Sequence, residues 1–236
     1  MVSLVAWSKI SIGSRNPAKN IAKLATAFLH ENSINKSDIG LLIHSGVYRI
    51  NFRAEPAFAP NIQKYMGLGD NEISPQSNHV FSFDVLDGTC GPHHAIQTIS
   101  DMFQYVNCKY AMLVVSDEKP NSLHKSGDFS SCIICAFARE GNFKLQESKF
   151  WNIDGELPAT YASFNGKQHY LNPPNNLVSE QGVQDKNSFS SDSNLSSANK
   201  MIDFFNWATG KKGTFEHIIN DVNGKNSSLV WRIDDA

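Results

Sequence analysis

Four side chains that could take part in nucleophilic or acid–base chemistry lie together in the middle of the chain: Thr89, Cys90, His93 and His94. They follow a short apolar segment and precede one with helical periodicity, so they are expected at a helix N-terminus. The partial positive charge there and a nearby imidazolium both lower the pKa of a thiol, which makes Cys90 a candidate nucleophile. A threonine hydroxyl ionises far above neutral pH, and the sequence offers no suitable base beside Thr89. Thr89 is therefore expected to be a helix N-cap.

The other reactive side chains have plainer interpretations. Unpaired cysteine is common among buried residues and is then usually inert. His93 and His94 are expected as partners of buried backbone groups or of groups at a subunit interface, not as a catalytic base pair. Cys132 and Cys135 have the spacing of a zinc or redox pair, but in an apolar strand their sulfurs point to opposite faces and no second pair completes a site. No metal site, phosphate-binding loop or cofactor is expected.

The composition is typical of an ordinary globular protein. The chain has 236 residues, 41% hydrophobic and 19% charged, with a formal net charge of −2. It lacks the basic patch that nucleic-acid binding requires. No apolar run is long enough to cross a bilayer and no signal peptide is expected, so no membrane association is predicted. Four irregularly spaced cysteines suggest a reducing compartment, and a cytoplasmic location is the expectation.

Strands and helices alternate along most of the chain. Apolar strands are expected at 2–12, 41–45, 80–85 and 110–115, and amphipathic helices at 17–32, 57–66 and 92–106. Two further strands, Cys132–Ala138 and Phe143–Ile153, are expected to pair antiparallel around the turn at Gly141-Asn142. The pattern predicts an α/β fold with a largely parallel central sheet.

The character of the sequence changes after Ile153. Residues 154–199 are mostly rich in Asn, Ser, Gly, Gln and Pro, which is typical of a polar loop or linker. The last segment predicts one helix and two strands: 201–208, 215–220 and 227–233. The predicted organisation is a structured region over 1–153, a polar loop or linker region over 154–199 and a small structured remnant over 200–236.

The segment around the candidate nucleophile resembles a known family. It contains Phe83-Asp84-Val85, then Thr89, Cys90 and Gly91, a helix, and an apolar strand that closes on Ser116-Asp117. This resembles the strand–nucleophile–helix–strand unit of the ketoacyl-acyl-carrier-protein synthase III family, which belongs to the thiolase-like superfamily. Thr89 falls at the family's nucleophile position and Cys90 one residue later. One residue corresponds to a rotation of about 100° around a helix axis, so Cys90 is expected to point away from the family's acyl tunnel.

The resemblance implies a layered, thiolase-like α/β fold made of two duplicated halves. The N-terminal half is expected to be complete and the C-terminal half strongly reduced, with Ile218–Ile233 as the closing hairpin. The family's catalytic His and Asn motifs have no counterpart between 154 and 236, and neither His169 nor His217 lies in a matching context. Asp84 matches a structural position of the family.

These features imply a non-catalytic subunit of a heteromeric ketosynthase or acyltransferase complex in fatty-acid or polyketide biosynthesis, similar to chain-length factors and cysteine-less partner subunits. The expected partner is a full-length, catalytically active synthase III-like subunit, with an acyl carrier protein as an additional candidate. The candidates for the interface and the partner's acyl tunnel are Glu55, Pro56, Phe58, Thr89, Cys90, His93 and His94. Two alternatives stay open: a minimal acyltransferase that uses Cys90, and a binding module that holds an acyl group or a carrier protein without chemistry.

Overall fold

The computed structural model describes ten stretches of the chain. These stretches are 2–12, 16–46, 57–69, 79–117, 131–152, 161–164, 167–170, 186–191, 196–221 and 224–235. Their elements are β1 (Ser3–Ser11), α1 (Pro17–Glu31), η1 (Lys36–Asp38), β2 (Ile39–Ser45), α2 (Phe58–Met66), β3 (Phe81–Val85), α3 (Gly91–Met102), β4 (Tyr110–Ser116), β5 (Ser131–Ala138), β6 (Phe143–Asn152), β7 (Tyr161–Phe164), β8 (Lys167–Tyr170), β9 (Ser188–Ser191), α4 (Ser197–Ala208), β10 (Gly213–Asn220) and β11 (Lys225–Ile233). The helices and strands expected from periodicity are confirmed, although α3 ends earlier than predicted.

The described strands form a nine-stranded sheet in the order β3-β2-β4-β5-β1-β6-β11-β10-β9, and β7 and β8 form a separate pair. Only β3 with β2, β2 with β4, and β9 with β10 run parallel; the other described neighbours in the large sheet are antiparallel. The prediction of a largely parallel sheet was therefore wrong. An antiparallel strand such as β5, buried on both faces, has the same continuous apolar sequence as a parallel strand.

The predicted pairing of Cys132–Ala138 with Phe143–Ile153 was also wrong. β1 lies between β5 and β6: Cys135 is opposite Trp7, and Phe143 is opposite Leu4. The turn at 139–142 therefore carries the chain past β1 instead of closing a hairpin. β6 then pairs along its length with β11. Turn residues between two apolar segments do not reveal that a third strand, far away in sequence, lies between them.

The strand order contains a repeat. In the first half the order is β3-β2-β4-β5-β1, and from β2 onward one parallel pairing is followed by two antiparallel pairings. In the second half the order β9-β10-β11-β6 shows the same succession of one parallel and two antiparallel pairings. By this correspondence β6, β9, β10 and β11 match β1, β2, β4 and β5, while α4 matches α3. The pairings thus associate β6 with the C-terminal strands, and β9 lies within the segment predicted as a polar loop or linker. This arrangement provides the two related halves that a thiolase-like fold requires.

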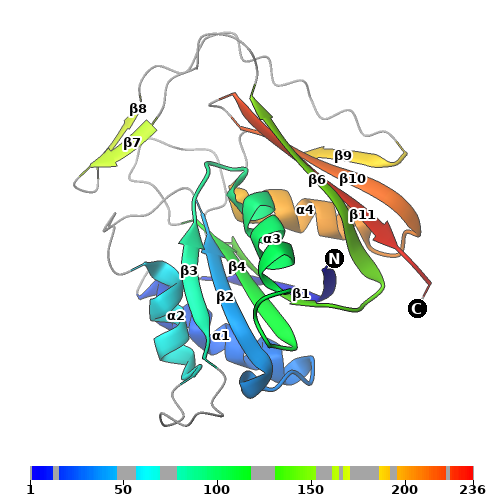
Figure 1. Cartoon of the computed structure of the whole chain (residues 1–236). Helices are drawn as coiled ribbons and strands as arrows, with labels where there is room; N and C mark the ends of the chain where they lie inside the picture. The colour runs from blue at the N-terminus through cyan, green and yellow to red at the C-terminus, as the bar shows by residue number, and fades with distance from the viewer. Residues whose placement is uncertain are drawn as a thin grey trace.

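The helices separate the structure into layers (Figure 1). α1 and α2 cover the outer face of the first half of the sheet, whereas α3 and α4 lie between the first and second halves. β2 is buried on both sides: Leu41 and Ile43 belong to the core around α3 and α4, and Leu42 to the core under α1 and α2. Among the described residues, no helix is long and apolar enough to span a membrane.

Candidate functional site

The candidate nucleophile position lies in a tight connection between β3 and α3. Gly88 has a φ of 54°, a left-handed conformation that glycine adopts without strain. At Gly91, the first residue of α3, an added Cβ would lie 2.5 Å from the Ser45 hydroxyl and 3.3 Å from the Val85 carbonyl oxygen. The two glycines therefore allow the helix to start directly against the ends of β2 and β3. This strand–turn–helix geometry agrees with the arrangement expected from the sequence.

Thr89 does not cap α3, contrary to the prediction. The N-cap residue of α3 is Cys90, and no side-chain hydrogen bond caps the helix there. The Thr89 hydroxyl instead donates to the Asp221 carboxylate, with 2.8 Å between Oγ1 and Oδ1, and both side chains are buried. A carboxylate is a stronger hydrogen-bond acceptor than a neutral group.

Asp221 is a site residue that the sequence did not reveal. It follows β10, 132 positions from Thr89, where the chain turns back: its amide donates to the carbonyl of Lys225 at 2.8 Å. Thr89 therefore has a carboxylate partner that sequence reasoning did not find. The only sequence signal was the Asn-Gly turn between two strands, and a turn signal does not indicate which other segment the turn contacts.

Cys90 is buried and its thiol is not activated. Its Sγ lies 3.8 Å from the carbonyl oxygen of Ile219 and 3.7 Å from that of Lys225, and the residue is 1% exposed. Burial raises the pKa of the Cys90 thiol to about 12, and the carboxylates of Asp221 and Asp87 act in the same direction. The lowered pKa expected from the helix N-terminus is not found, because loss of hydration outweighs the helix dipole.

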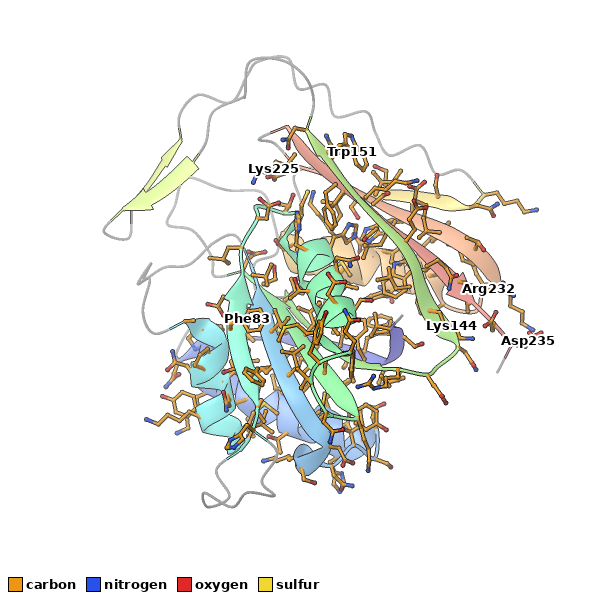
Figure 2. All side chains as sticks on the ribbon, viewed as in Figure 1. Phe83, Lys144, Trp151, Lys225, Arg232 and Asp235 are labelled. Carbon is orange, nitrogen blue, oxygen red and sulfur yellow. The ribbon has the colours of Figure 1, made fainter. Side chains whose placement is uncertain are left out.

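A partly exposed ionic cluster borders this loop. The Asp87 carboxylate accepts from His94 Nε2 at 2.9 Å with one oxygen and pairs with Lys225 Nζ through the other. Phe150 stacks on the His94 ring with 3.8 Å between ring centroids. Figure 2 shows Lys225 and Trp151 near the same end of the β6–β11 pair, opposite the end with Lys144 and Arg232. Burial lowers the pKa of His94, although Asp87 partly opposes the effect. The hydrogen bond that Lys225 donates to Asp87 raises the pKa of Lys225.

His93 points into the interior and contacts His217 on β10. Its Nε2 lies 3.0 Å from His217 Nδ1, and His217 Nε2 lies 2.8 Å from the Ser191 hydroxyl. Burial lowers the pKa of His93 to about 3 and that of His217 well below the usual value, with smaller contributions from the Lys200 charge. His93 thus belongs to a buried polar chain, and its partner is the His217 side chain, whereas a backbone or subunit-interface group was expected. His217, dismissed because of its sequence context, lies in the same cluster.

The remaining predicted residues lie elsewhere or outside the described residues. Phe58 begins α2, where its amide donates to Asp84 at 2.7 Å and its ring lies 4.6 Å from that of His44. Glu55 and Pro56 lie outside the described residues. Cys132 and Cys135 are free and lie in the cores on opposite sides of the sheet, as predicted. In the described part of the chain, no group of three His, Cys, Asp or Glu side chains could hold a metal ion.

Comparisons with known proteins identify the fold. No protein-family model and no curated protein matches the chain. Among solved structures, the chain is similar to the tetronic acid condensing enzyme AbyA1, with a TM-score of 0.73, 10% identity, and coverage of 98% of this chain and 99% of that one. OleA from Xanthomonas campestris gives a TM-score of 0.72, 11% identity and 98% coverage of both chains. The 3-oxoacyl-[acyl-carrier-protein] synthase III from Aquifex aeolicus VF5 gives 0.65, 8% identity, and coverage of 98% and 100%.

These similarities confirm the resemblance at the level of the fold. The chain has the mixed α/β, thiolase-like fold of synthase III-like condensing enzymes. The matches extend over nearly the full length of the solved chains, so a strongly reduced C-terminal half stays a prediction. Identities of 8–11% carry no information about activity, which has to be argued from the side chains themselves.

Proposed function

We propose that this chain is a non-catalytic subunit of a ketosynthase III-like complex and pairs with an active synthase III-like subunit whose acyl tunnel it shapes. The observation that carries the proposal is the buried hydrogen bond from Thr89 to Asp221. By the sequence resemblance, Thr89 falls at the position where the family places its cysteine. Its hydroxyl is tied to a carboxylate of the same chain.

The chemistry of condensation supports a silent role. Decarboxylative condensation needs a thiolate to carry the acyl chain and hydrogen-bond donors to hold an enolate. Cys90 is a poor source of thiolate, because its pKa is raised to about 12. The buried imidazoles of His93 and His217 have lowered pKa values and are already paired with each other. The described side chains around Thr89 thus lack the activated thiol on which condensation depends.

The sheet offers a surface for a partner. β3 is an edge of the described sheet, and an edge strand presents backbone groups that can pair with another chain. Phe81, the first residue of β3, is 55% exposed. In the family that the chain resembles, subunits pair next to the nucleophile-bearing strand and helix. Pairing along β3 would bring Phe58 close to the partner subunit, because the Phe58 amide donates to Asp84 on β3. Glu55 and Pro56, which precede Phe58 in the sequence, stay candidates for the same interface.

Co-expression with a full-length synthase III-like protein encoded near this chain tests the proposal. We expect the two chains to co-purify, and Phe81→Lys to weaken the complex at least tenfold, because a charge would be buried at the strand edge. Tyr105→Lys is the matched control, since Tyr105 is an 82% exposed aromatic outside β3. A chain that stays monomeric and binds no such synthase would refute the proposal.

The activity of the complex gives a second measurement. The active partner should produce a different distribution of acyl chain lengths with and without this chain, while a variant of the partner that lacks its own cysteine should be inactive in both cases. Condensation by this chain without a partner would contradict the proposed role.

A further inference from the structure

One edge of β1 has no partner strand over most of its length. β1 pairs along its length with β5, but it pairs with β6 only through Ser3 and Leu4. A shift in register between Leu4 and Ala6 marks a β-bulge, and a bulge bends the strand that carries it. Every residue from Val5 to Ser11 is at least partly exposed, whereas β2 is buried throughout. Among the described strands, none covers this edge of β1 beyond Leu4.

A cavity of about 400 Å³ lies beside the start of the open edge. Val5 and Trp7 of β1 line one side of it, Asn142 and Phe143 line another, and Ile233 at the end of β11 completes the wall. None of the residues that line the cavity is ionisable. Its volume falls within the usual range of ligand sites, roughly 300–1,000 Å³, so it has room for a large apolar group.

The aromatic walls of the cavity are held in place from behind. Trp7 packs against Phe205 of α4 with 5.6 Å between ring centroids. Phe143 packs edge-on against the completely buried Trp231, with 5.0 Å between ring centroids. The cavity is therefore formed before a ligand enters it, which reduces the entropy lost on binding.

The position of the open edge limits what can occupy it. β1 is the fifth of the nine strands in the order of the sheet, and β6 and β11 follow it. A second folded copy of the chain would meet these strands before its own edge reached β1. A single extended chain needs only the spacing between neighbouring strands, about 4.8 Å. Extended peptides bind to open strand edges through their main chain, while pockets beside the edge hold alternate side chains.

We infer that the open edge of β1 binds an extended peptide segment of a partner protein as an added strand, with one large apolar side chain of the peptide in the cavity. Main-chain groups of alternate residues between Val5 and Ser11 supply the hydrogen bonds. Lys9 is exposed on the same strand and favours an acidic residue opposite it in the peptide. This site is separate from β3, the edge strand on which the proposed function depends.

Panning of a phage-displayed library of random heptapeptides against the purified full-length chain tests the inference. We expect enriched peptides that carry a large apolar residue and that also bind as synthetic peptides with blocked ends. Val5→Lys should weaken their binding at least about tenfold, because it places a charge in the wall of the cavity. Methylation of the peptide amides, one at a time, should weaken binding about tenfold at alternate positions only, where the amide faces β1.

Trp151→Lys is the matched control for Val5→Lys. Trp151 lies on a strand outside the cavity and is 43% exposed, against 40% for Val5, so its replacement should leave peptide binding unchanged. Urea denaturation would establish that both variants are folded. If Val5→Lys is not, Asn142→Lys places the charge at the same cavity from an exposed residue.

Hydrogen exchange locates the bound peptide. Amide protons of alternate residues between Val5 and Ser11 should exchange more slowly when the peptide is present. The inference would be overturned by a library without enriched peptides, by peptides that tolerate methylation at every amide, or by binding that Phe81→Lys abolishes and Val5→Lys does not. Co-purification with a synthase is measured independently, so this inference and the proposed function can fail separately.

Discussion

The Nε2 atom of His93 lies 3.0 Å from the Nδ1 atom of His217, and both imidazoles are completely buried. The two residues come from α3 and β10 and are 124 positions apart in sequence. Phe204 stacks on His217 with 4.3 Å between ring centroids, and the Ser191 hydroxyl reaches the other nitrogen of His217. One hydrogen-bonded chain therefore links α3 to β10 and β9.

Stability should fall in mild acid because of this histidine pair. Burial lowers the pKa of His93 to about 3, against 6.5 for an ordinary histidine, and the pKa of His217 shifts in the same direction. The unfolded chain thus binds protons from about pH 6.5 downward while the folded chain does not. The stability that depends on these two histidines staying neutral is fully present above pH 6.5 and is lost as the pH falls towards 3. Between pH 7 and 5 we expect His93 alone to cost about 2 kcal/mol in free energy of unfolding, and His217 to add to that loss.

Urea denaturation at a series of pH values measures this effect. His93→Gln should reduce the pH dependence between 7 and 5, even if the variant is less stable overall. His30→Gln serves as the matched control, because His30 is exposed on α1 and should leave the pH dependence unchanged. An identical slope for the wild type and His93→Gln would contradict a buried, neutral His93.

The hydrogen bond between Thr89 and Asp221 should contribute to stability. Thr89→Val keeps the shape of the side chain but removes the donor, which leaves the buried carboxylate without this partner. We expect a loss of about 1–3 kcal/mol in free energy of unfolding, the usual cost of removing one partner of a buried hydrogen bond. Thr89→Ser retains the hydroxyl and should lose less. Equal stability of Thr89→Val and the wild type would show that the contact does not form in solution.

The sequence predicted the elements of the first half well because each has a strong local pattern. Apolar residues at helical spacing defined α1, and the continuous apolar segments defined β2 and β4. The motif from Phe83 to Asp117 predicted a strand, a tight turn, a helix and a second strand, and β3, α3 and β4 confirm these elements. Strand direction was not predicted reliably, because a strand that is buried on both faces has the same composition whether its neighbours are parallel or antiparallel.

The site was harder to predict because its contacts are distant in sequence. Thr89 and Asp221 are separated by 132 positions, and no local pattern marks an aspartate after a strand as the partner of a threonine. His217 has an ordinary strand context, and it joins the site because β10 lies opposite α3 in the fold. The pKa of Cys90 was misjudged for a related reason: its helix position is a local property, whereas its burial involves Ile219 on β10 and Lys225 on β11.

Cys90 should be unreactive in the folded protein. At a pKa of about 12 only a very small fraction of the thiol is ionised at neutral pH, and the residue is 1% exposed. With iodoacetamide at pH 7.5 we expect Cys90 to react at least 100-fold more slowly than in the urea-denatured chain. Peptide mapping gives the extent at each cysteine, with the partly exposed Cys108 as an internal comparison. Rapid, stoichiometric labelling of Cys90 would favour the alternative of a minimal acyltransferase.

Asp84 should stabilise the start of α2, in agreement with the structural role that the family resemblance implied. Its two carboxylate oxygens accept from the amides of Phe58 at 2.7 Å and Ala59 at 2.8 Å, so a strand residue caps a helix far from it in sequence. Asp84→Ala removes both acceptors and should cost about 2 kcal/mol in free energy of unfolding. The amides of Phe58 and Ala59 should also exchange hydrogen faster, which distinguishes loss of the cap from a general destabilisation.

Asp101→Ala is the matched control for the cap. Asp101 is exposed near the end of α3, where its carboxylate accepts from Gln97 at 2.7 Å, and loss of an exposed contact should change stability by less than about 0.5 kcal/mol. Asp84→Asn keeps one acceptor oxygen and should lie between Asp84→Ala and the wild type. If Asp84→Ala were no more damaging than Asp101→Ala, the two amides of α2 would have to find other acceptors. In that case the position of α2, and of the neighbouring segment expected to reach a partner, would not depend on β3.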